Sequence, residues 1–80
     1  MWYLYILQCK DKSLYTGVTL DIGRRIAEHR FGKGSKYLRG RLPVKLVYQE
    51  SCRNKSCALR REAQIKQWDR PAKLALILDK

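Results

Sequence analysis

The hydrophobic and polar positions of the chain begin with two short apolar runs on either side of a polar turn. Residues 2–8 (WYLYILQ) and 14–18 (LYTGV) are rich in aromatic and branched side chains, and the segment KDKS lies between them. Two such runs around a turn predict a β-hairpin. A further run of this kind, VKLVYQE at residues 44–50, predicts a third strand.

Helical periodicity and capping residues predict helices at about 21–31, at about 55–68 and from residue 69 onward. The candidate caps are Thr19 or Asp21 for the first helix, Asn54 or Ser56 for the second, and Asp69, followed by Pro71, for the third. The segment FGKGSKYLRGRLP contains three glycines and a proline, so we expect a loop with one short helical turn. The apolar LALIL of the last helix must pack on the sheet.

The order of these elements, β-β-α-β-α-α, predicts an α+β fold with a small three-stranded, largely antiparallel sheet and helices packed against it. Residues 1–80 are expected to form a single domain, because a chain of this length has no room for a second. Folding buries only about 60% of the unfolded surface at this size, so every inward-facing position matters.

The chain is strongly basic, with 18 Lys and Arg against seven acids and a formal net charge of +11. This charge favours a nucleic acid as partner rather than a membrane, since the apolar helix faces are needed for the core. The start of the chain lacks a basic leader, and the thiols of Cys9, Cys52 and Cys57 are odd in number. We therefore expect a cytoplasmic protein with reduced thiols. We also expect no small-molecule cofactor, and a monomer or weak dimer.

The segment GRRIAEHR turns polar side chains toward the core. Ile22 and Ile26 lie one helical turn apart and define the inward face. At about 100° per residue, Arg25 and His29 fall at the edge of that face, whereas Arg24 points toward water. An arginine and the only histidine of the chain are thus predicted to face inward.

The helix predicted at 55–68 shows the same feature with an acid. Glu62 lies within its apolar stripe, which consists of Ala58, Leu59 and Ile65. Burying a lone carboxylate is costly unless a cation or hydrogen-bond donors compensate. Two interpretations stay open: an internal salt bridge from Glu62 to Arg25 or Arg61, and a functional carboxylate.

Tyr5 and Tyr15 lie on the two strands of the predicted hairpin. If the turn centres on Asp11, both side chains point to the same face of the sheet. Gly17, near the end of the second strand, leaves room for a phosphate or another backbone to approach. The alternative is that both tyrosines are ordinary strand aromatics.

Five separate features follow one another along the chain: Tyr3-Leu4-Tyr5, Tyr15-Thr16-Gly17, Arg25, His29 and a glutamate on a later helix. Their order and spacing resemble the GIY-YIG nuclease superfamily, and most of all its small stand-alone bacterial proteins. The resemblance extends from Trp2 to about Trp68 and implies a metal-dependent phosphodiesterase.

The resemblance also assigns roles. Tyr5 and Tyr15 match the two motif tyrosines, Arg25 the helix arginine, His29 the polar residue that follows it, and Glu62 the single metal-binding glutamate. The chain departs from the pattern at two points. Tyr3 stands where the first motif has glycine, and no asparagine occurs beyond Asn54, although many members carry one after the glutamate.

The chemistry of these residues is consistent with phosphodiester hydrolysis. A single inward-facing carboxylate suits one Mg²⁺ or Mn²⁺ ion, which keeps several waters and takes a phosphate oxygen as ligand, whereas a two-metal site needs clustered carboxylates. Arg25 is suited to clamping the phosphate oxygens. By analogy with the family, Tyr5 is the base or positions the water, and Tyr15 supports it or binds phosphate; His29 is the alternative base.

No acid occurs between Glu28 and Glu50, and this stretch is basic with interleaved aromatic residues. Such a composition predicts a flexible loop that follows a phosphate backbone and stacks on unpaired bases. The residues predicted to bind nucleic acid are Gly17, Arg30, Lys33, Lys36, Tyr37, Arg39 and Arg41.

Together these features predict a metal-dependent endonuclease that acts on single-stranded or structured DNA with little sequence specificity. RNA is the other possible substrate. One alternative is a basic nucleic-acid-binding module with the same fold that does not cut. Another is an accessory protein of structured RNA or a larger assembly, in which Glu62 and Arg25 only neutralise each other.

Overall fold

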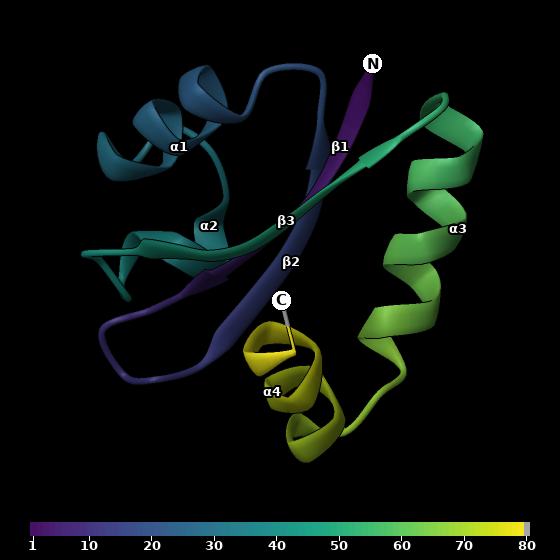
Figure 1. The fold of residues 1–80 in the computed structure, drawn as a ribbon. Coiled ribbons are helices and arrows are strands. Elements are labelled where there is room, and N and C mark those ends of the chain that lie inside the picture. Colours follow the sequence, from purple (N-terminus) through teal and green to yellow (C-terminus); the bar gives the residue numbers. More distant parts are fainter. Residues whose placement is uncertain (80) are drawn as a thin grey trace.

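The computed structural model describes residues 1–79 and is built on an antiparallel three-stranded sheet in the order β2-β1-β3 (Figure 1). The strands are β1 (Trp2–Gln8), β2 (Leu14–Thr19) and β3 (Lys45–Cys52). The third strand extends beyond the predicted 44–50 because Ser51 and Cys52 still pair with β1. Since β1 is central, β2 forms a free edge of the sheet.

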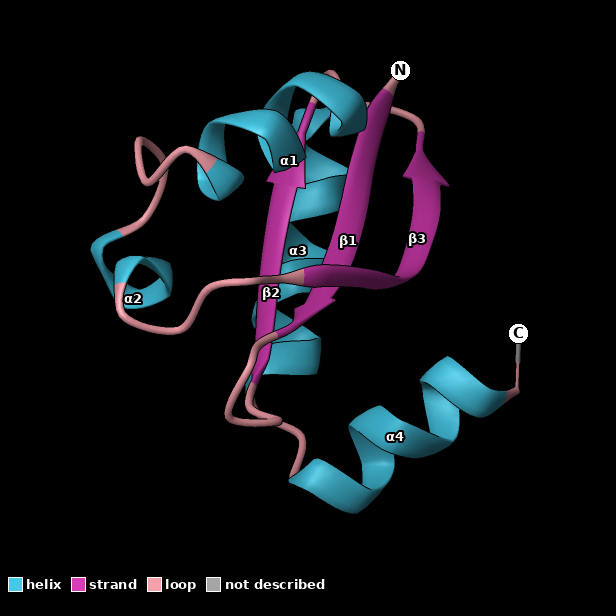
Figure 2. Cartoon of the chain, turned by 90° about the vertical axis from the view of Figure 1, so that its left-hand side faces the viewer, coloured by secondary structure: helices cyan, strands magenta, loops and turns pink. Residues whose placement is uncertain are grey.

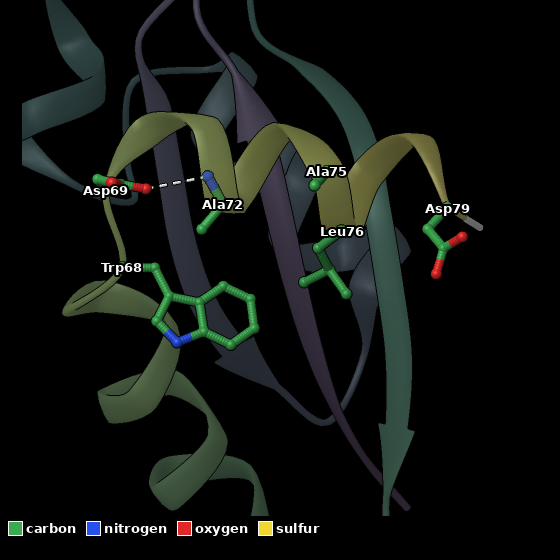
Figure 3. Close-up of a pocket in the computed structure, with 6 residues that line it drawn as sticks. All are labelled: Trp68, Asp69, Ala72, Ala75, Leu76 and Asp79. Carbon is green, nitrogen blue, oxygen red and sulfur yellow. Dashed lines mark hydrogen bonds between the residues drawn. The ribbon is translucent and has the colours of Figure 1, made fainter.

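The helices are α1 (Ile22–Arg30), α2 (Lys36–Arg39), α3 (Lys55–Lys66) and α4 (Arg70–Leu78). The side chains of Asp21, Asn54 and Asp69 accept hydrogen bonds from backbone N–H groups of α1, α3 and α4. Figure 3 shows the bond from the N–H of Ala72 to Asp69, at 3.0 Å. The predicted α+β order is confirmed, and within residues 1–79 no helix has the length and apolar character needed to cross a membrane.

The helices cover both faces of the sheet, and Figure 2 shows α1 in front of it and α3 behind it. On the α1 side, Tyr5 and Leu7 of β1 pack with Ile26 of α1 and Leu38 of α2. These side chains alternate with their neighbours along β1, because successive residues of a strand point to opposite faces. One apolar cluster therefore lies on each face.

The second cluster joins Leu4 and Ile6 of β1 to α3 and α4. Leu76 and Ile77 of α4 pack against it, so the prediction that LALIL covers the sheet is correct for these two residues. Leu78, at the end of the helix, is 83% exposed. Figure 3 shows the Leu76 side chain on the same side of α4 as the Trp68 indole.

The prediction that Leu59 belongs to the buried stripe of α3 is wrong. Ala58 and Ile65 are both fully buried, whereas Leu59 is 42% exposed. Ala58 and Ile65 are seven residues apart, which is close to two full turns, so they share one line along the helix. Leu59 is one residue, or about 100°, away from that line and faces the solvent.

Candidate active site

A buried hydrogen bond between β1 and α1 lies at the centre of the candidate site. The phenol oxygen of Tyr5 and Nε2 of His29 are 3.0 Å apart, and each side chain is only 1% exposed. Ile26 and His29 are three residues apart on α1, so both face the sheet. The inward direction predicted for His29 is confirmed, and its partner there is Tyr5.

Two glycines make room for this hydrogen-bonded pair. A Cβ atom on Gly17 would lie 2.6 Å from the phenol oxygen of Tyr5, and a Cβ atom on Gly34 would lie 2.0 Å from Nδ1 of His29. The sequence predicts that Gly17 admits a phosphate or a backbone, but in the structure the Tyr5 phenol takes the space over it. The role of Gly34 was not predicted, because one more glycine in a glycine-containing loop carries no separate signal.

Arg25 lies beside the phenol of Tyr5 at the edge of α1. Its side chain is 42% exposed, and its Nη1 donates to Oε1 of Glu28 at 3.2 Å. Hydrogen bonding to Glu28 and then to Tyr5 raises the pKa of the guanidinium, so Arg25 is a fixed cation. Its Nε is buried and has no hydrogen-bond partner within residues 1–79. The guanidinium is therefore held in place by Glu28, while its exposed part can bind a ligand.

Burial sets the protonation states of the central pair. Desolvation, together with the neighbouring Tyr15, raises the pKa of Tyr5 to about 12, although Arg25 acts in the opposite direction. Desolvation and the positive charge of Arg25 lower the pKa of His29 below its usual 6.5. At neutral pH the pair therefore consists of a protonated phenol and a neutral imidazole, which can accept a proton.

Tyr15 joins the site from β2. Tyr5 pairs with Gly17 and Leu7 pairs with Tyr15 across the hairpin, so the two tyrosines share a face as predicted. The Tyr15 ring centre lies 6.4 Å from that of Tyr5 and 5.6 Å from that of His29. On its other flank, Tyr15 stacks with Tyr37 at 5.9 Å. Tyr15 thus connects the buried pair to the surface.

Glu62 approaches the site from the other side of the sheet. It lies on α3, which packs against β1 and β2, and its side chain is 19% exposed. Burial and then the neighbouring Tyr15 are the larger causes of the raised pKa of Tyr5, and the negative charge of Glu62 makes a smaller contribution in the same direction. The carboxylate and the phenol therefore interact electrostatically, with the edge strand β2 beside them.

The salt bridge predicted as an alternative role for Glu62 is not formed with either expected arginine. Oε2 of Glu62 lies 3.3 Å from Nζ of Lys66, one turn later on α3. Arg25 pairs with Glu28 instead, and Arg61 pairs with Glu50 of β3. Since the Lys66 ammonium is on an exposed, flexible side chain, Glu62 is not locked into a buried ion pair.

The family model described as the GIY-YIG catalytic domain matches residues 1–75, which include every residue of this site. The chain belongs to the GIY-YIG family. It is 53% identical over 75 residues to a UPF0213 protein of Streptococcus agalactiae, an alignment that covers 94% of this chain and 85% of the relative. A UPF0213 protein of Staphylococcus haemolyticus is 55% identical over 75 residues, with coverage of 94% and 92%.

A solved structure shows the same fold. The solution NMR structure of a UPF0213 protein from Bacillus halodurans is 47% identical to this GIY-YIG chain and aligns with a TM-score of 0.65. The alignment covers 100% of this chain and 86% of the other.

GIY-YIG nucleases use a divalent metal, and the donor set of this chain is compatible with one hard ion. Within residues 1–79 no three His, Cys, Asp or Glu side chains gather in one place, which argues against a zinc-type cage or a two-metal cluster. Glu62 offers a partly exposed carboxylate whose salt bridge within residues 1–79 is to Lys66. A single carboxylate with water completing the shell is a common way to hold Mg²⁺.

The basic residues predicted to bind nucleic acid lie on the α1–α2 side of the molecule and fall into two groups. Arg39 donates to the carbonyl of Gly32, and Arg41 pairs with Asp11 at 3.1 Å and lies over the Tyr37 ring. These two arginines therefore brace the loop. The others are exposed on the end of α1, the following loop and α2, and they are Arg30, Lys33 and Lys36.

Replacing Gly17 with alanine should disrupt the central pair of this GIY-YIG site. The added Cβ would overlap the Tyr5 phenol, which must move and weaken its bond to His29. We expect a loss of about 1–3 kcal/mol in the free energy of unfolding, measured by urea denaturation. Gly40→Ala is the control, because a Cβ at Gly40 has no atom within 4 Å. Equal urea midpoints for the two variants would contradict the geometry.

Proposed function

We propose that this GIY-YIG protein is a metal-dependent endonuclease that hydrolyses phosphodiester bonds in DNA with one Mg²⁺ or Mn²⁺ ion. The observation that carries the proposal is the gathering of Arg25, Tyr15 and the Tyr5–His29 pair beside edge strand β2, with the charge of Glu62 acting on the same phenol. The net charge of +11 supports a polyanionic substrate.

In this proposal the exposed groups bind the phosphate, and the buried groups accept the proton that the attacking water releases. Arg25 is partly exposed, permanently charged and held by Glu28, so it can stabilise the charge that develops on the non-bridging oxygens. Tyr15 is suited to positioning the phosphate beside it. Glu62 would hold the divalent ion, which when bound supplies further neutralisation of the phosphate charge and activates water.

The Tyr5–His29 pair is proposed as the acceptor for the proton of the attacking water. A phenol with a pKa of about 12, raised mainly by burial, still carries its own proton at neutral pH, so Tyr5 cannot by itself accept a proton from water. The neutral imidazole removes this difficulty, because Nε2 can take the phenol proton over 3.0 Å while the phenol oxygen takes the proton of water. Tyr5 and His29 then act together as one base, whereas the sequence suggested them as alternatives.

This assignment predicts the acid side of the pH profile. His29 must be neutral, and burial lowers its pKa, so kcat/KM should be constant near pH 7 and fall with one proton at a midpoint below 6.5. Tyr5 should not titrate in the assay range, since its pKa is near 12 because of burial. The measurement is cleavage rate against pH at saturating Mn²⁺. A midpoint above 6.5, or an unchanged acid limb in His29→Gln, would contradict the role of His29.

The substrate is proposed to be single-stranded or structured DNA, read with little sequence specificity. The exposed cations Arg30, Lys33 and Lys36 contact a phosphate backbone without reading bases. The free thiols Cys9, Cys52 and Cys57 fit a reducing compartment, so we place the reaction in the cytoplasm.

The test of the proposed function is a cleavage assay on labelled single-stranded, branched and duplex DNA and on RNA of the same sequence. Each substrate is incubated with Mn²⁺, with Mg²⁺ and with a chelator. We expect metal-dependent products from single-stranded or branched DNA. Products that persist with the chelator would overturn the metal site, and salt-sensitive binding without products would indicate a non-cutting binding module.

A further inference from the structure

A hollow of about 300 Å³ lies next to the candidate site at the start of β2. It is lined by residues of β2, α2, α3 and α4, which are Leu14, Tyr15, Thr16, Tyr37, Lys66 and Lys73. Successive residues of β2 point to opposite faces of the sheet, so Tyr15 belongs to the α1 side while Leu14 and Thr16 belong to the α3 side. The hollow therefore wraps around the free edge of the sheet.

The lining residues combine aromatic surface with positive charge. Tyr37 is 41% exposed; it stacks with Tyr15 and the Arg41 guanidinium lies over its ring, so one wall consists of two tyrosine rings with a cation beside them. The ammonium groups come from two different helices, Lys66 at the end of α3 and Lys73 within α4. Aromatic rings beside lysines are what single-stranded nucleic acids need, since bases stack on rings and phosphates pair with cations.

The two lysines are in different states. Lys66 pairs with Glu62 at 3.3 Å. Lys73 is half-buried in the lining, and within residues 1–79 no carboxylate lies at salt-bridge distance from it. A half-buried ammonium without a carboxylate is the position at which an incoming phosphate gains most. Lys73 therefore marks where the anion would bind.

The hollow is continuous with the catalytic groups. Tyr15 lines it and also lies 5.6 Å from the His29 ring, and Lys66 lines it while it contacts Glu62. A strand whose phosphate is bound by Arg25 and Glu62 would thus place its neighbouring nucleotide here.

We propose that this hollow is a nucleotide subsite, which binds the base next to the cleaved phosphodiester against the wall formed by Tyr15 and Tyr37, and that nucleotide's phosphate on Lys73. The proposal rests on the proposed function, because it assumes that a DNA strand lies along β2. It restricts the substrate further. A base that stacks in the hollow must be unpaired, so the subsite selects single-stranded DNA over duplex.

Binding without cleavage tests the subsite by itself. The probe is fluorescein-labelled oligothymidylate in the presence of chelator, with affinity measured by anisotropy over a range of salt concentrations. Lys73→Gln should weaken binding about tenfold. It should also reduce the slope of log affinity against log salt by about 0.7, the value for one phosphate contact on a single strand. The control is Arg70→Gln, which removes one exposed charge from the same helix but not from the hollow.

The aromatic wall has its own test. Tyr37→Leu should weaken binding of oligothymidylate at least about fivefold, and should have little effect on an oligomer that carries an abasic site at the stacked position. Circular dichroism of both variants verifies that the fold is intact. Equal effects of Lys73→Gln and Arg70→Gln, or equal effects of Tyr37→Leu on the two probes, would overturn the subsite.

Failure of the subsite proposal can be distinguished from failure of the nuclease proposal. If the subsite is wrong, wild-type protein still cleaves DNA with metal while Lys73→Gln binds like Arg70→Gln. If the nuclease proposal alone is wrong, no metal produces cleavage, while Lys73→Gln still weakens binding more than its control.

Discussion

Replacing Glu62 with glutamine should lower metal-dependent cleavage by at least about a thousandfold, which corresponds to about 4 kcal/mol of transition-state stabilisation. Glu62 is the carboxylate proposed to hold the ion, and within residues 1–79 no cluster of three candidate ligands exists to replace it. The substitution keeps the size of the side chain and removes its charge. Single-turnover cleavage of single-stranded DNA with Mn²⁺ measures the loss.

Glu50→Gln is a matched control for this prediction. Glu50 is also a partly exposed carboxylate paired with a basic side chain of α3, since Arg61 donates to it at 3.0 Å. It lies on β3, at the opposite edge of the sheet from β2. We expect Glu50→Gln to lower stability without lowering the cleavage rate. A Glu62→Gln protein that cleaves at the wild-type rate would remove the metal site from this position.

The second large effect is expected for Arg25→Lys, which should lower kcat about a hundredfold or more. Lysine keeps the positive charge but loses the fork that can bind Glu28 and a phosphate oxygen together. Because the charge remains, affinity for DNA should change little. Steady-state kinetics and anisotropy on the same oligonucleotide separate kcat from binding.

The neighbouring residue provides the comparison. Arg24 is 79% exposed and pairs with the same Glu28 at 3.8 Å, and by helical phase it lies on the side of α1 opposite Ile26. Arg24→Lys should leave kcat unchanged, whereas equal losses for Arg24→Lys and Arg25→Lys would show that Arg25 acts only through the general charge of α1. The comparison of the two adjacent arginines therefore tests whether the position of the side chain on α1, rather than its charge, determines kcat.

Much of the fold could be predicted because its signals are local. The apolar runs around KDKS, the caps Asp21, Asn54 and Asp69, and the periodicity of α1 each involve residues that are close in sequence. The inward direction of His29 follows from the same periodicity. Leu59 shows the limit of such reasoning, because one residue of helical phase decides between core and solvent.

The partners of the polar side chains were less well predicted. Glu62 pairs with Lys66, and the i, i+4 spacing of these two residues is a local signal of helical ion pairs that was available in the sequence. The contact between Gly34 and His29, by contrast, depends on how the loop after α1 folds back over that helix. This contact has no period or motif in the sequence.

The sequence by itself determined the order of the elements, the faces of α1 and the hairpin, and the family through its spaced tyrosines, arginine, histidine and glutamate. Only the tertiary structure decided that Tyr5 and His29 share a buried hydrogen bond and that Lys66 and Lys73 from two helices line one hollow beside Tyr15. The physical reason is that local sequence sets the direction of a side chain relative to its own element. Distances between elements, and the burial that shifts the pKa of Tyr5 and His29, arise only when the elements pack.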